Sequence, residues 1–416
     1  MRTVRLDEGL YRTDADNGVI VLSERLPTVR SVAAGMWVRS ASAHEEPAKM
    51  GVSHLLEHMV FKGTERRSAR DIALALEVRG GSLDAFTARD HTVYQARVLD
   101  ADLPCALDIL TDLVRSPSLR EQDLTLERRV VLEEISTVED TPDDLVFDLH
   151  AETLWPDHSY GYPILGTRAT VGALGAEDLR VLHRRAYHPR HIVIAAAGNL
   201  DHEVLLRLLT RLGWFTFPPG PEPTDVPMSP AARQVTRRVA RAGAQTHVVI
   251  GTDTFPYREP RRNALLLLNN VLGGGMSSRL FQRVREELGL AYAVFAFQSF
   301  YRHGGVTGVY VGTHPNTAAQ AVEAILTELG RVAREGLDAH TLAEAKQQLK
   351  GQVTLALESP AARMYRLAGV PLHDVSYRTI DETVAEIEAV TADDITAVAA
   401  EFLDPERQAA VWLGPQ

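Results

Sequence analysis

The stretch Leu174-Gly175-Ala176-Glu177-Asp178-Leu179 returns 216 residues later as Val390-Thr391-Ala392-Asp393-Asp394-Ile395. Two further matches occur in the same order. Residues 119–142 align with residues 337–360 at an offset of 218, and the region around Pro47 aligns with that around Pro260 at an offset of 213. Three matches in one order, at nearly one offset, indicate a duplicated unit of about 200 residues.

A proline-rich stretch separates the two copies. Six of the 21 prolines lie between residues 217 and 230. A segment with this much proline forms a stiff, extended connector. We therefore expect an N-terminal unit at residues 1–216, a linker at 217–231 and a C-terminal unit at 232–416.

Each unit mixes strand and helix patterns. Residues 32–38 form a short apolar run and residues 91–98 alternate, which is typical of strands. Residues 71–77 and 124–135 have the spacing of amphipathic helices. The sequence therefore predicts an α+β fold of two homologous units, each a mostly antiparallel sheet covered by helices.

Charge and hydropathy exclude several classes of protein. The chain has 44 Lys and Arg against 55 Asp and Glu, and the net charge of −11 has the wrong sign for a nucleic-acid-binding surface. It contains no run of 18 apolar residues, and its first residues are charged. We expect a cytoplasmic protein without a membrane span or a nucleic-acid partner.

The candidate metal ligands lie in the first copy, in the stretch His54-Leu55-Leu56-Glu57-His58. On a helix, His54 and His58 are four residues apart and share a face. Two imidazoles are then presented to one metal ion, and Glu57 lies where it can take a proton from bound water. The alternative is a pair of histidines whose hydrogen bonds are satisfied within a core.

A second predicted helix adds carboxylates, because Glu127 and Glu134 are seven residues apart and share a face. Glu134 could be the third ligand, with Glu127 orienting a ligand histidine; the alternative is a solvated helix face. The second copy lacks all five polar residues, which fits a site used in one copy only. The equivalent positions are Leu267, Asn270, Val271, Ala345 and Gln352.

The sequence resembles the M16 (pitrilysin-type) zinc metallopeptidases, or inverzincins. The resemblance rests on the His-x-x-Glu-His motif and on a glutamate 76 residues beyond its second histidine. The stretches FKGT at 61–64, GGSLDAFT at 80–87 and VLEEI at 131–135 fit as well. The likeness covers essentially the whole chain and extends to bacterial homologues of the mitochondrial processing peptidase beta subunit. It implies the duplicated fold of M16 peptidases.

The resemblance also implies a metal site. One zinc ion per chain would be bound by His54, His58 and Glu134. Glu57 would be the general base, and Glu127 would support a ligand histidine.

A substrate site is implied by two further pairs of residues. Arg285 and Tyr292 match a pair that reaches the substrate from the second unit; without the family, a solvent-facing Arg285 and a strand-initiating Tyr292 would be favoured. Asp84 and Ala85 match a strand whose edge pairs with extended substrate. Many relatives carry Asn at the position of Asp84, so the local specificity is open.

We therefore expect a zinc endopeptidase that hydrolyses unfolded peptides or oligopeptides. Glu57 would take a proton from zinc-activated water and return it to the leaving amine, while Tyr292 could donate to the carbonyl oxygen. The resemblance implies a homodimer, or a heterodimer with a related chain. The alternative function is a non-catalytic scaffold or partner subunit of a processing-peptidase-like complex.

Overall fold

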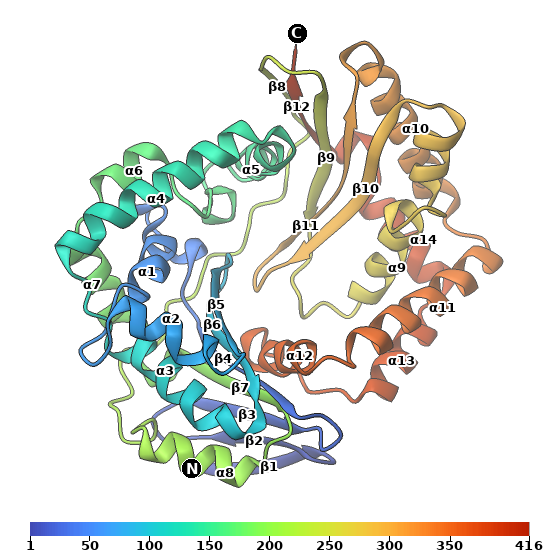
Figure 1. Ribbon diagram of the computed structural model, residues 1–416. Coiled ribbons are helices and arrows are strands. Elements are labelled where there is room, and N and C mark those ends of the chain that lie inside the picture. The colour runs from blue at the N-terminus through green and yellow to red at the C-terminus, as the bar shows by residue number, and fades with distance from the viewer. Residues whose placement is uncertain (416) are drawn as a thin grey trace. The chain divides into compact units, whose positions relative to one another are not determined.

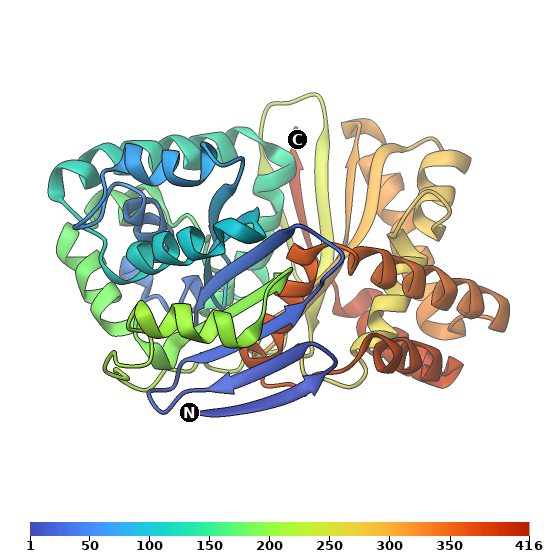
Figure 2. The same ribbon diagram turned by 60° about the horizontal axis from the view of Figure 1, so that its bottom comes forward.

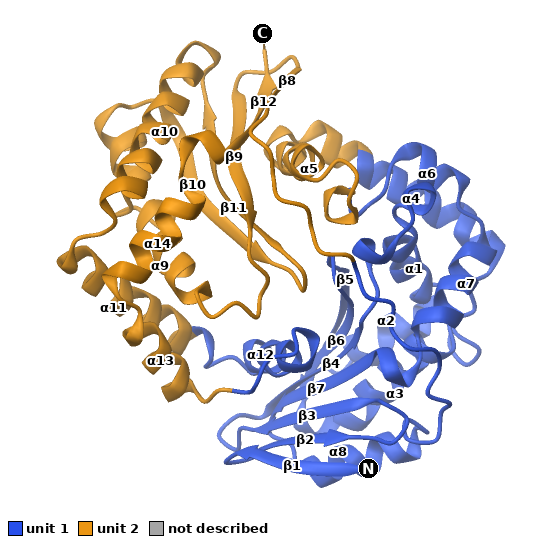
Figure 3. Cartoon of the chain, turned by 180° about the vertical axis from the view of Figure 1, so that it is seen from behind, with its two compact units in different colours: residues 1–135, 163–226, 356–377 blue, residues 136–162, 227–355, 378–416 orange. Residues whose placement is uncertain are grey.

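The computed structural model describes residues 1–415, which form two compact units. Unit 1 consists of residues 1–135, 163–226 and 356–377, and unit 2 of residues 136–162, 227–355 and the chain from 378 on (Figure 3). Each unit combines a sheet with helices, so the α+β class and the two-unit organisation are confirmed. One of the places where the chain passes from unit 1 to unit 2 lies between Val226 and Pro227, within the proline-rich stretch.

The two units do not coincide with two continuous halves of the chain. Helix α5 (Pro142–Leu154), from the first half, packs on strands of unit 2. Helix α12 (Pro360–Leu372), from the second half, packs on strands of unit 1. An amphipathic pattern shows that a helix has a buried face but not which sheet it covers. The ranges 1–216, 217–231 and 232–416 therefore stay a prediction about the repeat and do not describe the packing.

Unit 1 is built on a seven-stranded sheet with the order β1-β2-β3-β7-β4-β6-β5, in which β3 and β7 are the parallel pair (Figures 1 and 2). Its strands are β1 (Arg2–Asp7), β2 (Leu10–Asp14), β3 (Ile20–Arg25), β4 (Ser31–Val38), β5 (Ser82–Thr87), β6 (Thr92–Leu99) and β7 (Ile192–Gly198). Its helices, besides α12, are α1 (Val52–Val60), α2 (Ala69–Glu77), α3 (Leu103–Arg115), residues 121–135 of α4 (Glu121–Asp140), α6 (Arg168–Ala173), α7 (Ala176–Ala186) and α8 (His202–Arg211).

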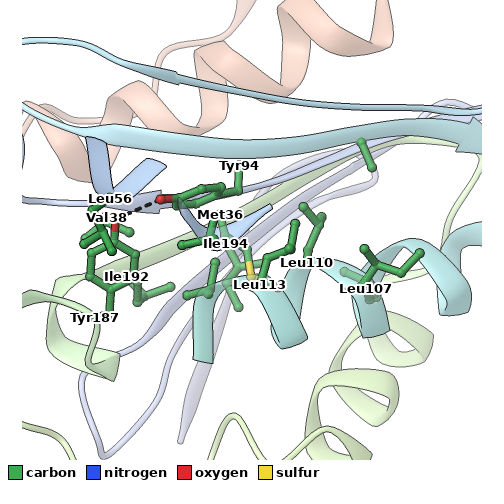
Figure 4. Close-up of a cluster of buried hydrophobic side chains, with 14 of the residues drawn as sticks. Met36, Val38, Leu56, Tyr94, Leu107, Leu110, Leu113, Tyr187, Ile192 and Ile194 are labelled. Atoms are coloured by element: carbon green, nitrogen blue, oxygen red, sulfur yellow. Dashed lines mark hydrogen bonds between the residues drawn. The ribbon is translucent and has the colours of Figure 1, made fainter. Parts of the chain in front are cut away.

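Both faces of this sheet are buried at its central strands β4 and β7. In β4, Met36 and Val38 point into a cluster with leucines of α1 and α3 (Figure 4). Trp37, between them, lies in a second cluster with Met364 and Leu367 of α12. Strands that are covered on both faces need apolar side chains in both directions, which explains why residues 32–38 do not alternate.

Unit 2 contains a five-stranded sheet with the order β10-β11-β9-β12-β8 and one parallel pair, β12 and β8. This order matches β5-β6-β4-β7-β3 of unit 1, including the position of the parallel pair. The duplication seen in the sequence is therefore a duplication of topology. The strands are β8 (Thr236–Ala240), β9 (Thr246–Thr254), β10 (Ala291–Phe300), β11 (Gly305–Thr313) and β12 (Ala409–Gly414). The helices, besides α5, are α9 (Arg262–Gly273), α10 (Ala318–Glu335), α11 (Ala339–Ala356), α13 (Ile380–Ala389), α14 (Ala392–Phe402) and the π-helical turn Phe281–Glu287.

The elements predicted from the sequence are present within a few residues. The predicted strands at 32–38 and 91–98 are β4 and β6, and the predicted helices at 71–77 and 124–135 are α2 and part of α4. None of the helices described in residues 1–415 combines the length and the apolar character needed to cross a lipid bilayer.

Buried histidines make the stability of the fold sensitive to acid. Burial lowers the pKa of five histidines to about 4; these are His44, His91, His150, His183 and His191. Between about pH 4 and pH 6.5, an unfolded chain binds protons at these residues that the folded chain does not. Stability then falls as pH falls through this window. Burial raises the pKa of Glu45 to about 7 and also raises that of Glu57, which acts in the opposite direction but involves two groups against five.

We predict that the thermal unfolding midpoint of the metal-free protein is lower at pH 5 than at pH 7. Each buried histidine can lower the free energy of unfolding by up to about 1.4 kcal/mol per pH unit. His183→Gln should make the midpoint depend less steeply on pH, because it removes one of the five titrating imidazoles. The fold should be kept, since the glutamine amide can still donate to the Val114 carbonyl that now contacts Nε2. The exposed His340 provides the control, because His340→Gln should leave the slope unchanged. A midpoint that is constant or higher at pH 5 would contradict the prediction.

Candidate metal centre

Helix α1 begins with an unusual N-terminus. The residue before its first turn is Gly51, whose φ of 89° lies in the left-handed region. A Cβ atom at this position would lie 2.5 Å from the carbonyl oxygen of Leu165, so glycine is required by both conformation and space. The Glu45 carboxylate accepts hydrogen bonds from the backbone N–H groups of Gly51 and Ser53, each at 2.8 Å. These contacts fix the start of the helix that carries the motif.

His54 and His58 lie on one face of α1, with their ring centroids 4.6 Å apart. The Nε2 atom of each ring is 3.6 Å from the same oxygen, Oε2 of Glu134 on α4. One donor atom from each of the three residues lies within 4.8 Å of the other two. In residues 1–415, no second group of three His, Cys, Asp or Glu side chains converges in this way.

The three donors fit a zinc ion. Two ligand atoms that each lie about 2.0–2.1 Å from zinc, at a tetrahedral angle, are about 3.3 Å apart. The two distances of 3.6 Å between imidazole nitrogen and carboxylate oxygen are close to that value. Two imidazoles with one carboxylate are also a donor set of catalytic zinc sites, which keep a further position open.

The electrostatic environment keeps His54 neutral. Burial, with a smaller effect of the neighbouring His58, lowers the pKa of His54 to about 3. A metal binds the neutral ring, so no proton has to be displaced from this ligand near pH 7.

The second glutamate of α4 lies behind His58. An oxygen of Glu127, Oε2, is 3.3 Å from Nδ1 of His58, on the side of the ring opposite Nε2. The other oxygen, Oε1, is 2.7 Å from Nζ of Lys62. Glu127 therefore occupies the position expected of a residue that orients a ligand histidine; that role stays a prediction.

Glu57 is buried beside the three donors. Its Oε2 accepts a hydrogen bond of 2.5 Å from the Thr87 hydroxyl at the end of β5. Burial raises the pKa of Glu57; the Thr87 hydrogen bond and His58 lower it, and the carboxylates of Glu134 and Asp84 raise it further. The net upward shift brings this carboxylate closer to the pKa range suited to a general base near neutral pH.

The predicted substrate strand is an edge strand. Within residues 1–415, β5, which carries Asp84 and Ala85, pairs only with β6, at one end of the seven-stranded sheet. Asp84 accepts a 3.4 Å hydrogen bond from Gln95, whose side-chain oxygen accepts one of 2.7 Å from Tyr365 on α12. An edge strand offers unpaired backbone groups to an extended chain.

Arg285 and Tyr292 lie together in unit 2. Arg285 is in the π-helical turn and Tyr292 is near the start of β10, with 77% of its surface exposed. The guanidinium carbon of Arg285 is 4.7 Å from the ring centroid of Tyr292 and 4.6 Å from that of Phe281. Tyr292 lies at the second position of a strand, close to what residue patterns alone favoured, and its ring also contacts the Arg285 guanidinium.

Three residues around the metal cluster were not assigned a role from the sequence. They are Glu45 at the start of α1, Lys62 after its end, and Thr87 on β5. Lys62 carries a weak signal, because it follows His58 by four residues. The other two contacts depend on tertiary packing and leave no spacing pattern.

Two family descriptions match the chain. Residues 20–168 match the family described as insulinase (peptidase family M16), and residues 173–349 match the peptidase M16 inactive domain. The first matched range contains the metal cluster, and the second contains Arg285 and Tyr292.

Individual proteins agree with these matches. A protein named uncharacterized zinc protease, from Streptomyces coelicolor, is 40% identical over 411 residues, covering 97% of this chain and 89% of that protein. A protein of the same description from Bacillus subtilis is 38% identical over 390 residues, covering 94% and 95%. The crystal structure of a protease from Helicobacter pylori has the same fold, with a TM-score of 0.91, 21% identity and coverage of 98% and 99%. The chain therefore belongs to the M16 peptidase family.

Proposed function

We propose that this chain is a zinc-dependent endopeptidase that hydrolyses unfolded peptides or oligopeptides. The observation that carries the proposal is the convergence of donor atoms from His54, His58 and Glu134 within 4.8 Å, beside the buried carboxylate of Glu57. Relatives named zinc proteases support the metal and the reaction class.

We assign one zinc ion to the chain, held by His54, His58 and Glu134. Bound there, zinc would supply Lewis-acid activation of water and polarisation of the scissile carbonyl. The burial that keeps His54 neutral prepares that ligand for the metal.

Glu57 is assigned as the general base. It follows His54 by three residues on α1, and its carboxylate is close enough to His58 and Glu134 for their charges to affect its pKa. The Thr87 hydroxyl holds Oε2, which leaves Oε1 to accept a proton from the attacking water. The same oxygen can pass the proton to the leaving amine when the peptide bond breaks.

The substrate is proposed to be an extended peptide. The edge of β5 at Asp84 and Ala85 can add a further strand, with backbone hydrogen bonds that do not depend on the peptide sequence. Arg285 would bind a substrate carbonyl or carboxylate, and the Tyr292 hydroxyl would donate to the oxygen on which charge develops. Only an unfolded segment can present its backbone in this way.

We predict that Glu134→Gln weakens zinc binding by at least tenfold. Loss of a residue that only orients a ligand lowers metal affinity by about 10- to 100-fold, and loss of a direct ligand should lower it by at least as much. Glu134 is 42% exposed at its side chain, so the substitution should not disturb folding. Glu133→Gln removes the same charge from the adjacent position and is the matched control. Equal zinc dissociation constants for the two variants, measured by chelator competition, would rule out Glu134 as a ligand.

The general base is tested with Glu57→Gln. This variant should retain zinc and lose peptide cleavage by at least about 10²-fold, because the amide cannot accept the proton from water. Metal analysis and cleavage of a broad peptide library, read by mass spectrometry, measure the two properties together. Glu77→Gln, on the exposed face of α2, should behave as the wild type. A wild-type chain that binds zinc but cleaves no peptide would instead favour the scaffold or partner-subunit role.

We also propose that the active form is a homodimer, since the family resemblance implies assemblies of four such units and this chain contains two. Light scattering of the purified protein should give about twice the mass of one chain. A fully active monomer would contradict the proposal. An inactive chain that gains activity with a related protein would show a heterodimer.

A further inference from the structure

The two histidines of the metal cluster are held differently. Within the described residues, Nδ1 of His54 is buried and has no hydrogen-bond partner. Nδ1 of His58 faces Glu127 at 3.3 Å, and Glu127 in turn contacts Nζ of Lys62 at 2.7 Å. Only His58 is therefore connected, through a carboxylate, to a cation outside the cluster.

Lys62 is anchored to both helices that build the cluster. Its backbone N–H donates to the carbonyl of Met59 at 3.1 Å, in the last turn of α1. Its carbonyl accepts a 3.0 Å hydrogen bond from Arg120, which directly precedes α4. The side chain thus starts from a fixed point between α1 and α4, and reaches Glu127, which lies nearly two turns after the start of α4.

Glu127 needs such a partner because of its burial. Its side chain is 8% exposed, whereas that of Lys62 is 36% exposed. A buried carboxylate without a counter-ion is strongly unfavourable, so removal of the cation leaves Glu127 to rotate or to seek other partners. With Oε1 bound to Lys62, the remaining oxygen is directed at His58.

We propose that Lys62 is a positioning residue for the metal site: it orients Glu127, and through Glu127 it holds His58 with its proton on Nδ1 and its Nε2 lone pair toward the metal. The inference rests on the proposed zinc site. A carboxylate behind a ligand histidine fixes the tautomer and the ring orientation, and its loss commonly weakens metal binding by about 10- to 100-fold.

A simple charge effect predicts the opposite sign. Lys62 carries a positive charge near a divalent cation, and repulsion alone would make zinc bind more tightly when the charge is removed. Orientation through Glu127 makes zinc bind more weakly after the same change. Whether zinc binds more weakly or more tightly after Lys62 is replaced therefore decides between orientation through Glu127 and charge repulsion.

The test is the zinc dissociation constant of the full chain carrying Lys62→Met, measured by chelator competition. We expect binding to weaken by about tenfold. Lys62→Arg should restore most of the affinity, because a guanidinium can donate to the same oxygen. Lys49→Met is the matched control: Lys49 has a similar exposure of 43% and pairs with Asp178 at 3.0 Å, but that pair shares no residue with the cluster.

A double-mutant cycle separates orientation from a general effect on folding. Glu127→Gln should weaken zinc binding, and adding Lys62→Met to it should have little further effect, because the two residues act through one contact. The thermal midpoint of each metal-free variant monitors folding. If Lys62→Met lowers that midpoint, Lys62→Ala replaces it, since alanine has no group that can donate to Glu127 and places no large apolar side chain at a half-exposed site.

Unchanged or tighter zinc binding in Lys62→Met would overturn the inference, and so would an undiminished effect of this change in the Glu127→Gln background. The outcome is independent of peptidase activity. A chain that binds zinc and cleaves nothing refutes the proposed function but still yields all four dissociation constants of the cycle.

Discussion

The rotation of helix α4 against helix α1 is the constraint on which the site depends. Val131 is buried, and it follows Glu127 by four residues and precedes Glu134 by three. Fixing this one side chain in the core therefore directs both glutamates along the same face of α4. On α1, Leu55 and Met59 are in the same hydrophobic cluster as Val131. A shared core thus brings the imidazoles to carboxylates about 70 residues away in the chain.

The second copy has the same arrangement of strands and helices but lacks the metal-binding side chains. Strand order and the parallel pair agree between the two sheets, and helices α9 and α11 occupy the positions of α1 and α4 in the repeat. Leu267 and Ala345, which stand where unit 1 has His54 and Glu127, are buried apolar side chains. Buried polar groups need partners, so an apolar replacement is the stable solution once no metal is bound. The fold therefore does not require the metal residues, and their presence in unit 1 calls for a functional reason.

Much of the candidate site could be predicted from local patterns in the sequence, whereas the rest depends on long-range packing. The spacing of His54 and His58 and that of Glu127 and Glu134 are properties of single helices, so sequence suffices to predict which side chains share a face. The pairing of α1 with α4 was a hypothesis that the repeat and the family resemblance supported. By contrast, the exchange of α5 and α12 between the sheets has no local signature, because each helix is amphipathic whichever sheet it covers. The contacts of Thr87 and Lys62 likewise depend on where a strand end and a turn meet other elements.

Charge balance connects the cluster to the stability of the fold. Glu57 and Glu127 are buried and Glu134 is half-exposed, while Lys62 forms an ion pair with Glu127. The upward shift in the pKa of Glu57, due to burial and partly to its acidic neighbours, shows that, among these carboxylates, Glu57 is held at a cost in free energy. A divalent cation between them would offset that cost, and binding to the folded state alone stabilises it by mass action. The arrangement that would make the site reactive is thus also one that makes it bind a metal.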